Sequence, residues 1–119
     1  MVTQGDFDIG AVNRIRDLGG DVLVSRIATV FSTYGQARVA DATAGDAEGD
    51  LPKVAAAAHA IRSSAANVGA TRLLAIATDL EHAARASRTD AIPDLVIGLR
   101  NAFDGARVYV LGCIPGGVS

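Results

Sequence analysis

The most informative part of this chain reads Asp50-Leu51-Pro52-Lys53-Val54-Ala55-Ala56-Ala57-Ala58-His59-Ala60-Ile61-Arg62-Ser63-Ser64-Ala65-Ala66-Asn67-Val68-Gly69. It opens on an aspartate, a residue type that caps helices, and the proline that follows is tolerated in a first helical turn. Alanine, the strongest helix former, fills much of its interior, and a glycine closes it. These features predict one helix that runs from a cap at Asp50 to about Val68.

One side of this predicted helix is apolar. On a wheel of about 100° per residue, its apolar side chains fall within one arc of roughly 100°. They are Val54, Ala57, Ala58, Ile61, Ala65 and Val68. His59 lies about 140° from the centre of that arc, so we expect its imidazole to point away from the core, toward solvent or a partner.

The surroundings of His59 on the outer face are sterically open. Its neighbours within one or two turns are Ala55, Ala56, Arg62, Ser63 and Ala66. Neutral imidazole is a good nitrogen nucleophile near pH 7, and an arginine three residues on can hold an anion against it. No carboxylate lies within one turn on this face, so we expect no acidic group to repel an incoming anion.

Two more helices are expected before this segment. The first, residues 9–18, is capped by Asp8 and stops at Gly19-Gly20. The second follows a cap at Asp21, and its inward side chains at the 3.6-residue period are expected to be Leu23, Ile27, Val30, Phe31, Tyr34 and Ala37. We expect Gly35 to bend or weaken this helix, and we interpret residues 44–49 as a loop.

Two further helices are expected after it. Residues 71–87 place Leu73, Ala77, Leu80 and Ala84 on one face. A last helix opens at Asp90 and Pro93, with Leu95, Leu99, Ala102, Phe103, Ala106 and Val110 inward. The pattern predicts an all-α fold, an antiparallel up-down four-helix bundle with a short additional N-terminal helix over one end. We assign residues 1–119 to a single domain with a helical core of about residues 8–112 and a flexible tail at residues 113–119.

Composition excludes several classes of protein. The formal net charge is −2 without a basic stripe, which argues against nucleic-acid binding. The single Cys113 excludes a disulfide framework and favours a reducing compartment. Residues 1–6 lack the basic and apolar regions of a signal peptide, and the longest apolar stretch, residues 54–61, is too short to span a bilayer. We therefore expect a cytoplasmic protein without a membrane segment, and no feature calls for more than a monomer.

The block His59-Ala60-Ile61-Arg62-Ser63-Ser64-Ala65-Ala66-Asn67-Val68-Gly69-Ala70 resembles the active-site helix of bacterial histidine phosphotransfer (HPt) domains. In that family the helix reads approximately H-x-L-K-G-S-[SA]-A-N-[LV]-G-A. Leu73, Leu80 and Glu81 fall where the family has its following leucines and glutamate. Upstream, Ile15-Arg16-Asp17-Leu18-Gly19-Gly20-Asp21 and then Phe31 resemble its first helix and turn, so that the resemblance covers about residues 9–111.

The resemblance implies a stand-alone phosphocarrier of a two-component phosphorelay. Such a domain takes a phosphoryl group from the aspartyl phosphate of one receiver domain and passes it to the aspartate of another. His59 is implied as the phosphoacceptor, supported by Arg62, in the place of the family's lysine, and by Ser63. The implied docking surface comprises Ala55, Ala56, Arg62, Ser63 and Ala66.

The same resemblance implies which partners and cofactors the chain needs. Its partners are response-regulator receiver domains and a hybrid sensor histidine kinase. The receiver supplies Mg²⁺, so that no intrinsic cofactor or metal is expected. No glycine-rich phosphate-binding loop is present in the sequence, which indicates a carrier and not an enzyme with its own ATP site.

Several points stay open at the level of sequence. Ser63 stands where the family has glycine, and its hydroxymethyl group could either crowd a phosphoryl group or donate a hydrogen bond to it. Tyr34 and Gln36 are candidates to contact the second ring nitrogen of His59. Two alternative functions are a non-transferring adaptor that binds a receiver or kinase through the same face, and a small metal-binding bundle that uses His59 and His82.

Overall fold

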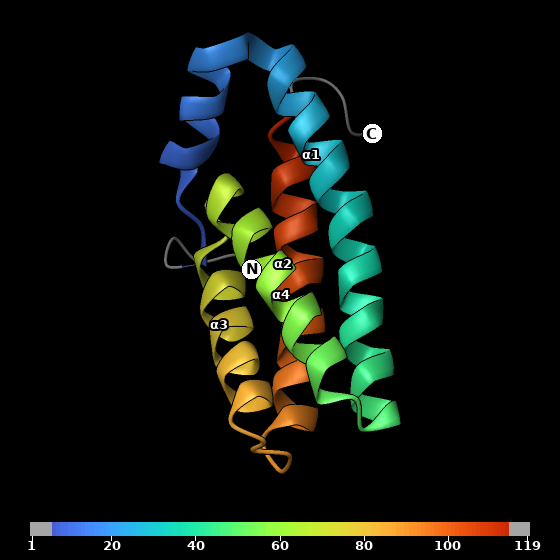
Figure 1. The fold of residues 1–119 in the computed structure, drawn as a ribbon. Helices are drawn as coiled ribbons and strands as arrows, with labels where there is room; N and C mark the ends of the chain where they lie inside the picture. Colours follow the sequence, from blue (N-terminus) through green and yellow to red (C-terminus); the bar gives the residue numbers. More distant parts are fainter. Residues whose placement is uncertain (1–5, 115–119) are drawn as a thin grey trace.

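Four helices form an antiparallel bundle in the computed structural model, which describes residues 6–114 (Figure 1). They are α1 (Ile9–Glu48), α2 (Leu51–Val68), α3 (Thr71–Arg85) and α4 (Ile92–Gly112). α1 packs against α2 and α4, and α3 packs against the same two helices, so that the four close around one core. No strand occurs within residues 6–114. The predicted all-α, up-down bundle is confirmed.

α1 changes direction sharply at Gly20. The backbone there has φ 71° and ψ −167°, a conformation open mainly to glycine. The short arm before this kink, blue in Figure 1, folds back over one end of the bundle, where the N–H of Asp8 donates to the carbonyl of Gly69 at 2.7 Å. The predicted additional N-terminal helix is this arm. Asp21 does not cap the second arm as expected, because its carboxylate pairs with Arg16 across the kink at 2.9 Å.

The predicted loop at residues 44–49 is wrong. α1 stays helical to Glu48 and ends at Gly49, which has φ 69°. Gly45, one of the residues that suggested the loop, is buried, and an added Cβ there would come within 2.8 Å of Val54 Cγ2. Gly45 therefore lets α2 pack close to α1, and it does not end the helix.

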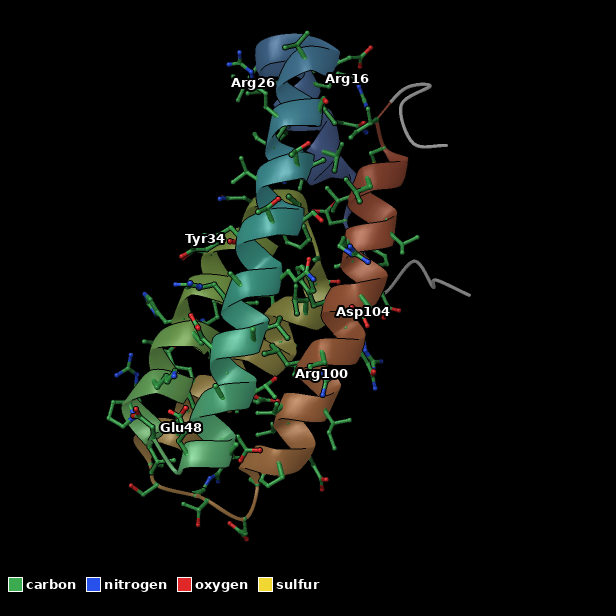
Figure 2. All side chains as sticks on the ribbon, turned by 90° about the vertical axis from the view of Figure 1, so that its right-hand side faces the viewer. Arg16, Arg26, Tyr34, Glu48, Arg100 and Asp104 are labelled. Carbon is green, nitrogen blue, oxygen red and sulfur yellow. The ribbon has the colours of Figure 1, made fainter. Side chains whose placement is uncertain are left out.

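The predicted core face of α1 is also wrong in part. Val30 and Tyr34 are exposed, by 63% and 43%, and Figure 2 shows Tyr34 on the outside of the bundle. The buried positions are Val24, Ala28, Phe31, Gly35, Val39, Ala42 and Gly45. Gly35 keeps helical backbone angles, so the expected bend is absent there. It lies against the ring of Phe103, with which an added Cβ would collide. Phe31 is buried as expected, but Ala37 is exposed, and Gly35 and Gly45 occupy part of the buried stripe.

The remaining helices bury the expected faces. On α2 the six predicted core residues are exposed by 3% or less, and on α3 Leu73, Ala77, Leu80 and Ala84 are buried. α3 ends two residues earlier than expected, at Arg85, and Ala91, not Asp90, holds the cap position of α4. Residues 115–119 of the predicted tail lie outside the described residues. No helix within residues 6–114 has the length and apolar character needed to cross a membrane.

Candidate functional site

His59 stands on the outer face of α2. Its side chain is 63% exposed, as the helical wheel predicted. The Asp50 carboxylate fixes the start of α2 by accepting the N–H of Lys53 at 3.1 Å, and Gly69 ends it in a left-handed conformation with φ 75°. A capped and well-packed helix thus presents an accessible imidazole at a defined position.

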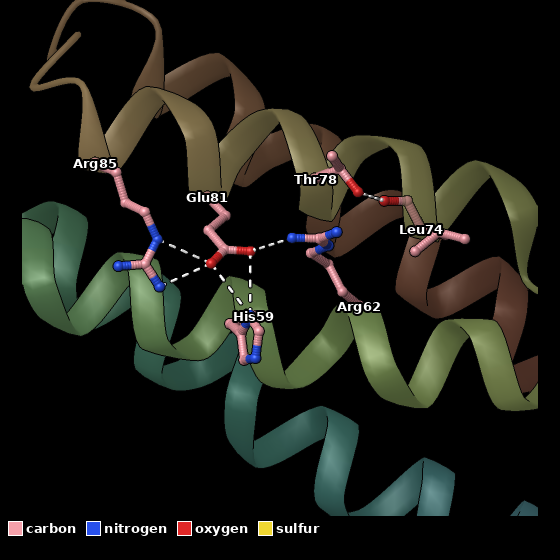
Figure 3. Close-up of polar contacts among 6 residues, drawn as sticks. All are labelled: His59, Arg62, Leu74, Thr78, Glu81 and Arg85. Carbon is pink, nitrogen blue, oxygen red and sulfur yellow. Dashed lines mark hydrogen bonds and ion pairs between the residues drawn. The ribbon is translucent and has the colours of Figure 1, made fainter.

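A buried carboxylate lies beside the ring, contrary to the sequence expectation. Glu81 of α3 is 5% exposed, and its Oε2 and Oε1 atoms lie 3.2 and 3.4 Å from His59 Nδ1 (Figure 3). The expectation that no acidic group lies near His59 was based on the residues of α2, whereas Glu81 belongs to the neighbouring helix α3. It also takes the ring contact for which Tyr34 and Gln36 were candidates.

Two arginines complete the cluster around Glu81. Arg62 of α2 donates through Nη1 to Oε1 at 2.7 Å. Arg85 of α3 donates to Oε2 through Nε at 2.9 Å and contacts it through Nη2 at 2.7 Å. Burial by itself would raise the pKa of Glu81, but the hydrogen bonds from Arg62, Arg85 and His59 outweigh it and lower the pKa to about 2. Glu81 is therefore a fixed anion at neutral pH.

The contact with Glu81 distinguishes the two ring nitrogens of His59. An ionised carboxylate only accepts hydrogen bonds, so Nδ1 must carry the proton that it donates. In the neutral ring, Nε2 then holds the free lone pair. Figure 3 shows this second nitrogen directed away from Glu81. In the neutral form of the ring, the lone pair of Nε2 therefore faces outward.

The expected docking residues lie around the imidazole, with one exception. Ala56, Ser63 and Ala66 are exposed. Ala55 is only 4% exposed and belongs to the core, so its expected place on the docking surface is wrong. Within residues 6–114 the hydroxyl of Ser63 has no hydrogen-bond partner, whereas the next hydroxyl, on Ser64, donates to the carbonyl of Ala60 at 3.4 Å.

α1 adds an apolar surface next to this face that the sequence analysis assigned to the core. A groove of about 360 Å³ runs between α1 and the C-terminal half of α2. It is lined by Ile15, Arg26, Ile27, Val30, Phe31, Ser64, Asn67 and Val68. Val30 lines this groove and is exposed, and Tyr34 of α1 is exposed as well, so that α1 adds apolar surface on which a protein partner could dock.

The histidines do not assemble into a recognisable metal site. Among the residues that the structure describes, no group of three His, Cys, Asp or Glu side chains is positioned to hold a metal ion. The carboxylate nearest to His59 is already engaged by two guanidinium groups.

Comparison with known proteins finds a protein family and a solved structure that match this chain. The Hpt domain family matches residues 23–108. Histidine-containing phosphotransfer protein B (HptB) from Pseudomonas aeruginosa PAO1 superimposes with a TM-score of 0.85 at 19% identity, over 91% of this chain and 93% of that chain. At 19% identity, this superposition shows that the two proteins share a fold. No curated protein sequence matches the chain at a significant level.

Proposed function

The chain belongs to the Hpt domain family, whose function is histidine phosphotransfer in phosphorelays, and on that premise we propose that His59 carries the phosphoryl group. The observation that supports this assignment is the geometry of the ring. His59 is exposed, its Nδ1 donates to a buried carboxylate, and its Nε2 faces outward with a free lone pair. The second histidine, His82, is also exposed, but no hydrogen bond to a carboxylate orients its ring among the described residues.

The proposed transfer needs no proton movement at the carrier. Nε2 of His59 attacks the phosphorus of an aspartyl phosphate, a P–N bond forms, and the P–O bond to the aspartate breaks, so that its carboxylate leaves as an anion. The ring keeps the proton on Nδ1 and becomes cationic, and Glu81, 3.2 Å away, faces that new charge. Onward transfer to a second aspartate reverses these steps and returns a neutral ring.

Arg62 and Ser63 are proposed to meet the phosphoryl oxygens. Arg62 precedes Ser63 in the sequence, and its guanidinium can reach the outer face of α2. In this structure that guanidinium donates a hydrogen bond to Glu81. Ser63 lies one turn after His59 on the same face, and its unbonded hydroxyl can donate to a phosphoryl oxygen. Of the two roles that the sequence left open for Ser63, its free hydroxyl favours hydrogen bonding over crowding.

Glu81 and Arg85 act through His59 and are positioning residues. Glu81 selects the tautomer of the ring, and Arg85 helps to hold Glu81 ionised and in place. Arg85 follows Glu81 by four residues on the same helix, a spacing at which side chains of opposite charge meet.

The partners of the chain are phosphorelay proteins, receiver domains and sensor kinases. We propose that a receiver docks on Ala56, Arg62, Ser63 and Ala66 and on the apolar surface of Val30 and Tyr34 beside them. The receiver supplies the acidic pocket and the Mg²⁺ of the transfer, so the chain needs no ATP site of its own. We propose that it works in the cytoplasm as a monomeric carrier.

The test is transfer from a phosphorylated receiver domain, read by intact mass at neutral pH. The wild type, His59→Ala and His82→Ala are compared, and the acid lability of each adduct is checked. We expect an acid-labile adduct of one phosphoryl group on the wild type and on His82→Ala, and none on His59→Ala. An adduct that survives His59→Ala would overturn the assignment. No adduct on a wild type that still binds its receivers would favour the adaptor.

A further inference from the structure

The ion cluster beside His59 has a consequence for the phosphorylated state, once His59 is accepted as the carrier. We propose that the carboxylate of Glu81 keeps the proton on Nδ1 of phosphorylated His59 and so holds the phosphoryl group in a labile, donor form. The inference deepens the proposed function and depends on it. It assigns to Glu81 a role after the phosphoryl group has arrived, in addition to its role in orienting the free ring.

The stability of the leaving group controls how easily a phosphohistidine loses its phosphoryl group. When the P–N bond of a phosphohistidine breaks, the electron pair of the bond returns to Nε2. If Nδ1 carries a proton, the leaving group is a neutral imidazole. If Nδ1 has lost that proton, the leaving group is an imidazolate anion, which is far less stable. Whatever keeps the proton on Nδ1 therefore favours cleavage, both to a receiver aspartate and to water.

The structure places the required anion at the correct nitrogen. Glu81 lies on the Nδ1 side of the ring, and Figure 3 shows Nε2 on the opposite side, so that the carboxylate stays in contact with Nδ1 when Nε2 is occupied. A nearby opposite charge favours the protonated form of an imidazole. Because Glu81 is 5% exposed, water screens this interaction less than it would at the surface.

The other charged groups around the ring limit the size of the effect. Arg62 from α2 and Arg85 from α3 both contact Glu81 and offset part of its charge. Among the described residues, α1 and α4 contribute no side chain to this cluster of ion pairs. Of these three charged groups, only the carboxylate of Glu81 favours a proton on Nδ1, whereas the two arginines weaken its effect.

The test compares the decay of phosphorylated His59 in the wild type and in Glu81→Gln between pH 5 and pH 9. Glutamine has a side chain of the same length as glutamate. Its amide oxygen can still accept the hydrogen bond from Nδ1, but the negative charge is removed. Each protein is loaded from a phosphorylated receiver, the receiver is removed, and the remaining adduct is followed by intact mass. At pH 5 both rings are protonated, and the two rates should agree within about twofold. At pH 8 the wild type should decay roughly tenfold faster, the ratio for a shift of about one pH unit in proton release.

Arg85→Gln provides a variant with an expected change of opposite sign. It removes a cation that competes for Glu81 and leaves the carboxylate in place, so its adduct should decay at least as fast as that of the wild type at pH 8. A loss of structure would move both variants in the same direction. If Glu81→Gln does not fold, the folded wild type is compared with the same adduct in urea, where decay at pH 8 should be slower.

The outcomes separate this inference from the proposed function. If the wild type forms no adduct on His59, the proposed function fails. If the adduct forms but Glu81→Gln shows the same pH profile as the wild type, or decays faster than it at pH 8, the role of Glu81 in the phosphorylated state is overturned and the carrier function stands.

Discussion

The two helix pairs of this bundle share one apolar core but differ in the additional contacts that join them. α2 and α3 are joined across their outer edge by a charged cluster in which the carboxylate of Glu81 meets Arg62 and His59 of α2. α1 and α4 are joined by close packing, in which Gly35 of α1 lies against the ring of Phe103 of α4. The polar contacts of the first pair orient the imidazole of His59, whereas the second pair is joined by close packing of side chains. Substitutions in the charged cluster should therefore change the chemistry of the site and the pH dependence of stability, whereas substitutions in the close-packed pair should change stability at every pH.

The largest expected effect on stability comes from acid and acts on the α2–α3 pair. Glu81 has a pKa lowered to about 2 from its ordinary 4.5, so its contribution to stability is complete above pH 4.5 and is lost as the pH falls toward 2. The shift corresponds to about 3 kcal/mol of unfolding free energy. Urea unfolding from pH 6 to pH 2.5 should show a steeper loss in the wild type than in Glu81→Gln. Parallel curves for the two proteins would contradict it.

Gly35→Ala should have the next largest effect, on the α1–α4 pair. The new Cβ collides with the Phe103 ring, so we expect a loss of about 1–3 kcal/mol in unfolding free energy although alanine favours helix. Thermal or urea unfolding measures it. Transfer to His59 per folded molecule should remain unchanged, because Gly35 has no contact with the charged cluster.

Ser63→Gly sharpens the account of the outer face. It removes the free hydroxyl one turn after His59 and restores the residue that the family has at this position. If the hydroxyl donates to the phosphoryl group, the rate of transfer should fall by about threefold to tenfold, the equivalent of one hydrogen bond. An increase in rate would show instead that the side chain crowds the phosphoryl group. Initial rates with a single phosphorylated receiver decide between the two.

Gly105→Ala on α4 is the matched control for Gly35→Ala and has the smallest expected effect. No atom lies within 4 Å of an added Cβ at this position. The same chemical change should therefore raise the unfolding free energy slightly, by about 0.5–1 kcal/mol, through helix propensity alone. A destabilisation as large as that of Gly35→Ala would mean that the α1–α4 contact is not the cause.

The part of the fold that periodicity controls could be predicted from sequence. α2 shows both terminal signals and a clear apolar face, and the exposed position of His59 follows from them. The apolar pattern did not predict the buried face of α1, because that face contains Gly35 and Gly45. These glycines are buried because the absence of a side chain lets Phe103 and Val54 come close, and not because glycine is hydrophobic. The glycine pair Gly19-Gly20 indicated the kink at Gly20, whereas no local pattern indicated that residues 44–48 are helical and that Gly45 packs against α2.

The charged cluster could be predicted only in part. Glu81 and Arg85 are four residues apart, a spacing that predicts an ion pair on one helix. The contacts from Glu81 to His59 and Arg62 depend on how α3 is aligned along α2, which no local pattern specifies. The sequence therefore predicted an exposed His59 as the candidate reactive residue, but it did not predict that Glu81 contacts the His59 ring.

The most direct test of the central claim is the identity of the phosphorylated nitrogen. Nitrogen-15 NMR of the loaded, histidine-labelled protein distinguishes the two ring nitrogens through their coupling to phosphorus and to the ring hydrogens. The geometry predicts a phosphoryl group on Nε2 of His59 and a proton on Nδ1 facing Glu81. Phosphorus on Nδ1, or on the ring of His82, would contradict it.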